Sequence, residues 1–383
     1  MEDILYKLNP WWDNKKIETS HTRPKYLSAI ESHIKSKEII FLTGLRRVGK
    51  TTILLQYIEK LLISTKPESI LFVNLDTFAL LEYTIHDIIE EYRKIHKKST
   101  EEFFYLFLDE VTSKPDFEKE LKSLYDVDNV KIICTSSIAT MMRDKKARLT
   151  GRTITIEIMP LTFTEFLTFK EVTVSKSDKS KLEGYFRDYL RIGGMPQYVL
   201  TEKEDYLNET VQNIIHKDII SQYNISSERV IKELFVLLCE RIGKTISYSK
   251  LANTLSISID SVKRYIGYFE ASYLFYIVHR YSKSPNENIT SPKKIYAGDV
   301  GIRNIVTGFR DLGAIYENLV FLQIKHKNPF YYLKDGVEID FITKNVLIEA
   351  KYGQTMNEKQ QKLFDTFSGD KKIASGVEFF MTD

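Results

Sequence analysis

Apolar runs and helically spaced apolar positions alternate along the first 160 residues of the chain. Residues 38–43 form a short apolar run typical of a buried strand, and from residue 53 to residue 62 the apolar positions recur every three or four residues. Further apolar runs lie at 69–75, 103–108, 130–134 and 153–158, and the stretch 85–96 has helical periodicity. Strands that alternate with helices predict a parallel sheet covered on both faces, so we expect an α/β fold.

The first strand runs directly into a glycine-rich segment with a complete phosphate-binding pattern. Residues 44–51 read Gly-Leu-Arg-Arg-Val-Gly-Lys-Thr and fit G-x-x-x-x-G-K-[ST]. Glycines let backbone N–H groups close around a β-phosphate, and the helix that follows adds the positive end of its dipole. We expect Lys50 to reach the β- and γ-phosphates of ATP and Thr51 to hold Mg²⁺. The candidate nucleotide-binding residues are Gly44, Arg46, Arg47, Val48, Gly49, Lys50, Thr51 and Thr52.

Two acidic residues follow the strand predicted at 103–108. Asp109 and Glu110 come directly after it, and the carboxyl ends of parallel strands meet at one edge of the sheet, beside the phosphate-binding segment. We expect Asp109 to bind Mg²⁺ through Thr51 or water, and Glu110 to orient and polarise the attacking water. Together these residues predict a site that hydrolyses ATP to ADP.

Two further residues are candidates for contact with the phosphates. Ser136 follows the strand predicted at 130–134, where a hydroxyl can contact the γ-phosphate or hold the water, although a serine-rich helix cap fits the same residues. Arg152 precedes the strand at 153–158 and can neutralise transition-state charge in its own subunit or in a neighbouring subunit of a homo-oligomer. An ordinary surface arginine is the alternative at this position.

Composition excludes several classes of protein. The 383 residues are enough for two or three domains, and no apolar run approaches the ~20 residues of a membrane span. The N-terminus has no basic and apolar signal segment, and Cys134 and Cys239 form no disulfide framework, so we expect a cytoplasmic protein without a membrane partner. The seven histidines are scattered, which argues against a zinc site, and a net charge of +3 does not by itself indicate nucleic-acid binding.

The middle of the chain contains a candidate helix-turn-helix. Residues 248–255 and 259–273 predict two helices joined by a tight turn, with Ser258 as the N-cap of the second. The second helix would display Lys263 and Arg264, which can meet DNA phosphates. This helix also carries two acidic residues and is not strongly basic, so use as a packing or partner surface is the alternative. Residues 273–279 are expected to form the wing of a winged helix.

Two turns organise the last third of the chain into a hairpin. Asp335-Gly336 lies between two strand-like runs and is a strong signal for a two-residue hairpin turn. Residues 337–342 alternate between apolar and polar, and a second turn at 344–345 would place Asp340 directly opposite Glu349. Facing carboxylates destabilise a sheet, whereas a divalent cation between them reverses that effect.

Asp340 followed by Glu-x-Lys on the paired strand is a pattern of metal-dependent phosphodiester hydrolysis. We expect Asp340 and Glu349 to hold Mg²⁺, with Glu317, on a helical stretch at 314–324, as a third carboxylate. Lys351 shares a strand face with Glu349 and would lower the pKa of the water or steady the phosphorus. The alternatives are a solvated strand face of mixed charge and a nuclease-like fold that only binds.

These segments occur in the order found in one large archaeal and bacterial family. The chain resembles the predicted AAA-type ATPases whose C-terminal domain of unknown function is similar to PD-(D/E)xK nucleases. The matching segments are 9–12, 44–52, 107–110, 151–152, 160–166, 193–196, 317–320, 336–341 and 348–351. One departure lies at 134–135, where this chain has Cys-Thr and the family usually has Thr-Gly before two serines.

The resemblance implies four domains and an activity for two of them. It implies an AAA-type ATPase domain at 1–160, a helical lid or linker at 161–225, a winged helix at 226–285 and a restriction-endonuclease-like α/β domain at 286–383. We expect an ATPase that acts on or near nucleic acid, with ATP and Mg²⁺ as cofactors and DNA as a candidate partner. The alternative is a nucleotide-dependent switch or scaffold whose C-terminal domain binds partners and cleaves nothing.

Overall fold

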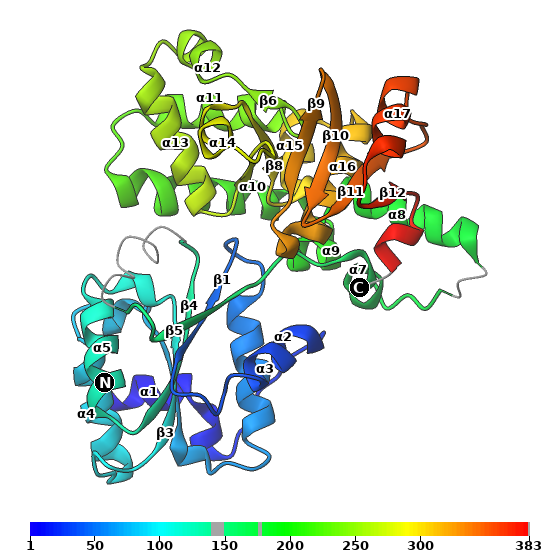
Figure 1. Cartoon of the computed structure of the whole chain (residues 1–383). Helices are drawn as coiled ribbons and strands as arrows, with labels where there is room; N and C mark the ends of the chain where they lie inside the picture. Colours follow the sequence, from blue (N-terminus) through cyan, green and yellow to red (C-terminus); the bar gives the residue numbers. More distant parts are fainter. Residues whose placement is uncertain (139–148, 175–177, 382–383) are drawn as a thin grey trace. The chain divides into compact units, whose positions relative to one another are not determined.

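The computed structural model describes residues 1–138, 149–174 and 178–381 (Figure 1). The chain divides into two compact units, Met1–Ile158 and Met159–Asp383, and each is described by itself. Among the helices in these described ranges, none has the length and apolar character that a membrane span needs.

The N-terminal unit is built on a five-stranded parallel sheet. Its order β2–β3–β4–β1–β5 places the strand before the phosphate-binding segment between two others, and all five residues of β1 are buried. The strands are β1 (Ile39–Thr43), β2 (Ile70–Asn74), β3 (Phe104–Asp109), β4 (Val130–Ser136) and β5 (Thr153–Glu157). The parallel sheet predicted from the alternation of strands and helices is therefore confirmed.

Helices cover both faces of this sheet (Figure 1). One face carries α1 (Glu2–Leu8), α4 (Ile85–His96) and α5 (Phe117–Val127), and the other carries α2 (Pro24–Glu31) and α3 (Lys50–Leu61). Successive side chains of a strand point to opposite faces, so Leu106 joins the apolar cluster under α4 while Phe107 meets the ring of Tyr57 from α3 at 6.5 Å.

The segment 9–12 closes the free edge of this sheet. The side-chain amide of Asn9 bonds β2 as the backbone of a neighbouring strand would. Its Nδ2 donates to the carbonyl of Phe72 at 2.9 Å, and its Oδ1 accepts from the N–H of Phe72 at 2.7 Å. The indole N–H of Trp12 donates to the carbonyl of Ile70 at 3.0 Å. Since β2 is an edge strand, these bonds satisfy backbone groups that would otherwise be open to another chain.

The second unit begins with helices in the region expected to form a lid or linker. They are α7 (Phe163–Phe169), α8 (Lys179–Ile192), α9 (Pro196–Thr201) and α10 (Glu204–Asn213), and α10 continues into π-helical turns at Ile214–Ser221. Thr162 and Glu165 form a capping box that begins α7, since each side chain bonds the backbone N–H of the other. Tilted ring contacts of Phe163 and Phe166 with Tyr189 hold α7 against α8.

A three-stranded antiparallel sheet follows, together with four helices. The elements are α11 (Glu228–Cys239), β6 (Thr245–Ile246), α12 (Tyr248–Leu255), α13 (Ile259–Ala271), β7 (Phe275–Val278), α14 (Pro285–Thr290) and β8 (Lys293–Ala297), with the strand order β6–β8–β7. Both helices expected around the tight turn are present, and Ser258 caps α13. The boundary expected at residue 285 differs, because β8 is the central strand of this sheet and lies beyond it.

The last part of the chain forms a four-stranded sheet between two helices. Its order is β12–β11–β10–β9, with β9 (Phe330–Lys334), β10 (Val337–Thr343), β11 (Val346–Lys351) and β12 (Asp370–Ser375). α16 (Leu312–Ile324) contacts β11, and α17 (Glu358–Thr366) contacts β10. The turn between β9 and β10 falls at Asp335-Gly336, where both residues have positive φ (51° and 75°), as a type I′ turn requires.

A buried aspartate ties the start of α9 to α15 (Val300–Thr307). Asp299, only 2% exposed, accepts hydrogen bonds from the N–H groups of Gly194 at 2.7 Å and Ile302 at 3.0 Å. The contact demands glycine, because a Cβ on Gly194 would lie 2.5 Å from the carbonyl oxygen of Leu161. Burial raises the pKa of Asp299 from 3.8 to about 6.

This raised pKa predicts that the second unit loses stability as the pH rises. The folded state holds the proton of Asp299 more tightly than the unfolded state does, so its contribution is complete below about pH 4 and lost as the pH rises through about 6, an effect of roughly 3 kcal/mol. Asp299→Asn should make the fall of the urea-unfolding free energy between pH 4.5 and 7 shallower by this contribution. Asp311→Asn, at the exposed N-cap of α16, should keep the slope; an unchanged slope in Asp299→Asn would refute the assignment.

Candidate functional site

The phosphate-binding segment is a loop whose backbone turns depend on glycine. Gly49 lies at the N-cap of α3 with φ of 99°, and Gly44 leaves β1 with φ of 141°. A Cβ on Gly44 would lie 2.3 Å from the carbonyl oxygen of Ile158, so no larger residue fits there. Arg47, within the loop, also has a positive φ of 64°. The loop therefore wraps around the N-terminus of α3.

Lys50 folds its side chain across this loop. Its ammonium donates to the carbonyl oxygens of Gly44 at 3.0 Å and Leu45 at 3.1 Å, and the residue is 4% exposed. The positive charge is thus held among the backbone groups at the start of the loop, next to the N-terminus of α3. Both features attract an anion to the same place.

Asp109 connects the carboxyl end of β3 to the phosphate loop. The hydroxyl of Thr51 donates to both of its carboxylate oxygens, at 2.9 and 3.0 Å, and the hydroxyl of Thr135 donates to one of them at 2.7 Å. Burial raises the pKa of Asp109, and these two hydroxyls oppose the rise. A buried carboxylate beside a hydroxyl provides the oxygen ligands that Mg²⁺ prefers, so the residues present fit that ion.

Glu110 lies beside Asp109 in a left-handed backbone conformation, with φ of 52°. Its N–H donates to the hydroxyl of Thr135 at 2.8 Å, and its carboxylate accepts from the hydroxyl of Ser137 at 3.3 Å. Two bonds from the end of β4 therefore orient Glu110. Sequence reasoning missed both hydroxyl residues, although their alternation along the strand with Ser136 could have indicated that they share a face.

Ser136 does not contact the acidic pair. Its hydroxyl instead bonds the carbonyl oxygen of Ile138 at 3.2 Å and the N–H of Ile138 at 3.1 Å. Side chains alternate along a strand, and Thr135 and Ser137 hold the positions that face Asp109 and Glu110. The structure thus brings the neighbours of Ser136, rather than Ser136 itself, to the predicted site.

Arg152 lies at the amino ends of the strands, whereas the phosphate loop lies at their carboxyl ends. Its carbonyl accepts from the N–H of Ile39, the first residue of β1, whereas the loop leaves the last residue of that strand. The five residues of β1 separate these two ends by about 15 Å. The guanidinium contacts Asp126 at 3.2 Å and lies 5.5 Å from the ring of Tyr125. Arg152 therefore lies away from the phosphate loop within its own unit, and a role in a neighbouring subunit stays a prediction.

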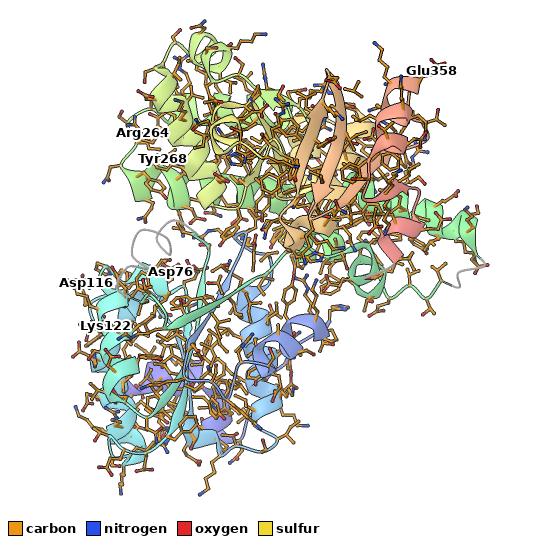
Figure 2. All side chains as sticks on the ribbon, viewed as in Figure 1. Asp76, Asp116, Lys122, Arg264, Tyr268 and Glu358 are labelled. Atoms are coloured by element: carbon orange, nitrogen blue, oxygen red, sulfur yellow. The ribbon has the colours of Figure 1, made fainter. Side chains whose placement is uncertain are left out.

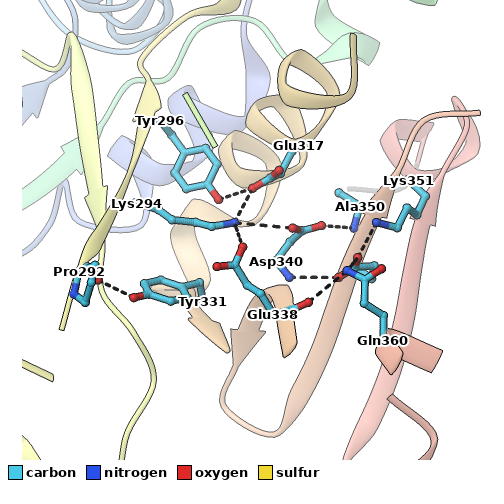
Figure 3. A network of polar contacts seen from close by, with 11 residues as sticks. Pro292, Lys294, Tyr296, Glu317, Tyr331, Glu338, Asp340, Ala350, Lys351 and Gln360 are labelled. Carbon is cyan, nitrogen blue, oxygen red and sulfur yellow. Dashed lines mark hydrogen bonds and ion pairs between the residues drawn. The ribbon is translucent and has the colours of Figure 1, made fainter. Parts of the chain in front are cut away.

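The second unit holds a cluster of buried charges between α16, β8, β10 and β11 (Figure 3). Asp340 and Glu349 are the residues next to the ladder pair Phe341–Ile348. The N–H of Asp340 donates to Glu349 at 3.1 Å, and the N–H of Ala350 donates to Asp340 at 2.9 Å. The two carboxylates predicted to face each other therefore lie side by side.

Glu349 is fully buried and its carboxylate has several partners. One oxygen accepts from the N–H of Asp340, and the other lies 2.7 Å from the ammonium of Lys351 and accepts from the amide of Gln360 at 2.8 Å. Burial raises the pKa of Glu349, and Lys351 opposes the rise. Lys351 thus shares the face of Glu349, as the strand period predicts.

The carboxylate of Glu317 does not share an open ion site with the carboxylates of Asp340 and Glu349. A buried lysine that sequence reasoning missed, Lys294 on β8, stands between Glu317 and the hairpin. Its ammonium lies 3.0 Å from Glu317, 2.7 Å from Glu338 and 3.7 Å from Asp340. No local signal distinguished Lys294 from Lys293, since adjacent lysines on a strand point to opposite faces and either can be the buried one.

The charges of this cluster shift one another's protonation. Burial raises the pKa of Glu317 to about 7 and that of Asp340 to about 6. Burial alone would lower the pKa of Lys294, but the carboxylates of Glu317, Asp340 and Glu338 outweigh it and raise that pKa. Within residues 1–138, 149–174 and 178–381, no three His, Cys, Asp or Glu side chains are grouped as a metal site requires.

Two parts of the chain match models of known protein families. Residues 36–167 match the model of an AAA domain, and residues 183–313 match the model of a domain of unknown function, DUF8612. Protein MJ1544 of Methanocaldococcus jannaschii is 28% identical over 370 residues, covering 90% of this chain and 82% of the relative. A protein of Haemophilus influenzae is 28% identical over 342 residues, covering 84% of each chain.

Two solved structures are similar at low scores. The Walker-type ATPase of Pyrococcus abyssi has 13% identity and a TM-score of 0.45, with 76% of this chain and 99% of that chain covered. DnaA of Aquifex aeolicus bound to AMPPCP has 18% identity and a TM-score of 0.31, with 69% and 92% covered. The likeness to AAA-type ATPases therefore depends on the AAA model match, the phosphate loop and the parallel sheet. The match over residues 36–167 supports an AAA-type ATPase domain in the N-terminal part of the chain.

Proposed function

We propose that the N-terminal unit binds ATP together with Mg²⁺ and hydrolyses it. The observation that carries this proposal is the continuous set of hydrogen bonds from Thr51 through Asp109 and Thr135 to Glu110, beside the loop that holds Lys50. ATP binding alone requires only the Mg²⁺ ligand Asp109, whereas hydrolysis also requires a second carboxylate, Glu110, oriented toward the attacking water.

Each residue of this set has a proposed role. The ammonium of Lys50 and the N–H groups of the loop residues Arg46, Arg47, Val48 and Thr52 bind phosphate oxygens. Thr51 and Asp109 hold Mg²⁺, which neutralises phosphate charge when bound. Glu110 orients the attacking water, and Thr135 and Ser137 position Asp109 and Glu110 through the bonds described above.

Titration with a fluorescent ATP analogue tests this function directly. The full chain should bind the analogue saturably in the presence of Mg²⁺ and should release inorganic phosphate from ATP. Chelation of Mg²⁺ should abolish phosphate release. A chain that folds but shows no saturable signal would contradict the proposal.

We propose in addition that α13 contacts nucleic acid. The order α11–β6–α12–α13–β7–α14–β8 with a three-stranded sheet supports a winged-helix arrangement, in which α13 is the exposed helix. Lys263 is 57% exposed, and Arg264 projects from the surface of the unit (Figure 2). The only acidic partner near Lys263, among the described contacts, is Asp260 at 3.9 Å.

Charge reversal on α13 tests this contact. Lys263→Glu with Arg264→Glu should weaken binding of duplex DNA about tenfold at low salt and lower the salt slope by about two, because two phosphate contacts are lost. Binding is measured by fluorescence anisotropy at several salt concentrations. The matched control is Lys119→Glu with Lys122→Glu on α5, which changes the net charge equally (Figure 2). An equal loss in both double variants would show that only overall charge matters.

The second candidate function is a nucleotide-dependent switch or scaffold that cleaves nothing. It is favoured by the contacts of the C-terminal carboxylates, which are already bonded to Lys294, Lys351 and Gln360. This candidate shares the ATPase activity of the N-terminal unit with the metal-dependent nuclease expected from the sequence, and the two differ in whether the C-terminal site uses a metal ion.

A further inference from the structure

We infer that Lys294 is a built-in cation that takes the place of a divalent metal ion in the C-terminal carboxylate cluster. The inference concerns the buried cluster of Figure 3, in which four carboxylates from α16, β10 and β11 surround two ammonium groups. These are Glu317, Glu338, Asp340 and Glu349, with Lys294 and Lys351. The C-terminal domain accordingly works without a bound metal ion and does not hydrolyse phosphodiesters.

The position of the Lys294 ammonium is that of a central ion. It contacts carboxylates of two different elements, Glu317 on α16 and Glu338 on β10, at 3.0 and 2.7 Å. Separations of this size are hydrogen bonds between an ammonium and a carboxylate, whereas Mg²⁺ binds its oxygens at about 2.1 Å. The carboxylates are therefore spaced for an ammonium.

Burial makes this arrangement more than a surface ion pair. Lys294 is 2% exposed, and a lysine is almost never buried unless it is paired. Burying an ammonium away from water is costly in free energy, and without its carboxylate partners Lys294 would be a buried charge with nothing to compensate it. Tyr296, two residues further along β8, donates its hydroxyl to the same oxygen of Glu317 at 2.7 Å. The strand thus delivers both a charge and a hydrogen bond to one face of the cluster.

The remaining carboxylate oxygens are also in use. Glu349 is bonded by Lys351, Gln360 and the N–H of Asp340, and one oxygen of Asp340 accepts from the N–H of Ala350. A metal ion would have to displace these donors as well as Lys294.

Metal binding by the full chain without nucleotide tests the inference. Mn²⁺ titration is followed by electron paramagnetic resonance. We expect the wild type and Asp340→Asn to bind the same number of Mn²⁺ ions, because the wild type has no site that depends on Asp340. Lys294→Met keeps the length of the side chain without its charge, and this variant should gain one Mn²⁺ per chain. That site should disappear when Asp340→Asn is added. Lys293→Met, which alters the neighbouring lysine of β8, should gain none.

Some outcomes would overturn the inference. A wild-type Mn²⁺ site lost in Asp340→Asn would show that Lys294 does not replace the metal, and so would a folded Lys294→Met chain without a new site. Should Lys294→Met fail to fold, the wild type alone still decides. Its thermal midpoint should not rise with Mn²⁺ in a manner that depends on Asp340, and Mn²⁺ should not induce cleavage of supercoiled DNA that Lys351→Ala abolishes.

Discussion

Lys50→Ala is expected to reduce ATP turnover by roughly a hundredfold or more and to weaken ATP binding. The ammonium of Lys50 lies within the phosphate loop, held by the carbonyl oxygens of Gly44 and Leu45. Replacing the lysine side chain with the methyl group of alanine removes the charge that would neutralise the β- and γ-phosphates, while the glycine turns of the loop remain. Phosphate release at saturating ATP and titration with a fluorescent ATP analogue measure the two effects.

The control for this variant lies on the same helix. Lys60 is near the C-terminal end of α3 and pairs with Glu31 on the surface at 2.9 Å. Lys60→Ala removes an equal charge from α3 and should leave turnover and affinity unchanged, since exposed ion pairs contribute little. Normal turnover in Lys50→Ala would mean that the glycine-rich segment does not serve the terminal phosphates, and the proposed function would fall.

Glu110→Gln should separate hydrolysis from binding. An amide cannot polarise water as a carboxylate does, so turnover should fall by about 10²–10⁴-fold. Affinity for ATP should stay close to that of the wild type, because Glu110 is assigned to the water and not to the phosphates. Single-turnover hydrolysis and equilibrium binding distinguish the two quantities.

Two comparison variants sharpen this result. Asp109→Asn should weaken the Mg²⁺-dependent part of ATP binding as well as turnover, because Asp109 is the carboxylate bonded to Thr51. Glu101→Gln changes an exposed glutamate before the opposite end of β3 and should have no effect on either quantity. Equal losses of affinity in Glu110→Gln and Asp109→Asn would contradict the separate roles assigned to the two carboxylates.

Much of the fold could be predicted because its signals are local. The apolar runs of the N-terminal unit became parallel strands, and the helix expected at 85–96 is α4, since apolar spacing alone distinguishes these two structures. Asp335-Gly336 forms the expected turn because few other residue pairs adopt positive φ at both positions. The second two-residue turn, at 344–345 between β10 and β11, sets the register that places Asp340 beside Glu349.

Other features depended on elements that lie far apart in the chain. Sequence position suggested that Arg152 could reach a phosphate of its own chain, but the sheet order puts it at the amino ends of the strands. Ser136 was favoured among three neighbouring residues, and only the direction of the strand's pleat showed that Thr135 and Ser137 face the acidic pair. The boundary expected at 285 ignored β8, which pairs with strands on both sides.

The sequence by itself determined the chemistry that this protein presents: a loop for phosphates, two carboxylates at a strand end, and a hairpin with an acidic pair. Each follows from residues close together in the chain, whose spacing already specifies their geometry. Only the tertiary structure decided which charges meet, and Lys294 is the main example, since it lies 23 residues from Glu317. Whether a buried carboxylate faces a vacancy or an ammonium depends on how separate elements pack, and no periodicity along the chain encodes that.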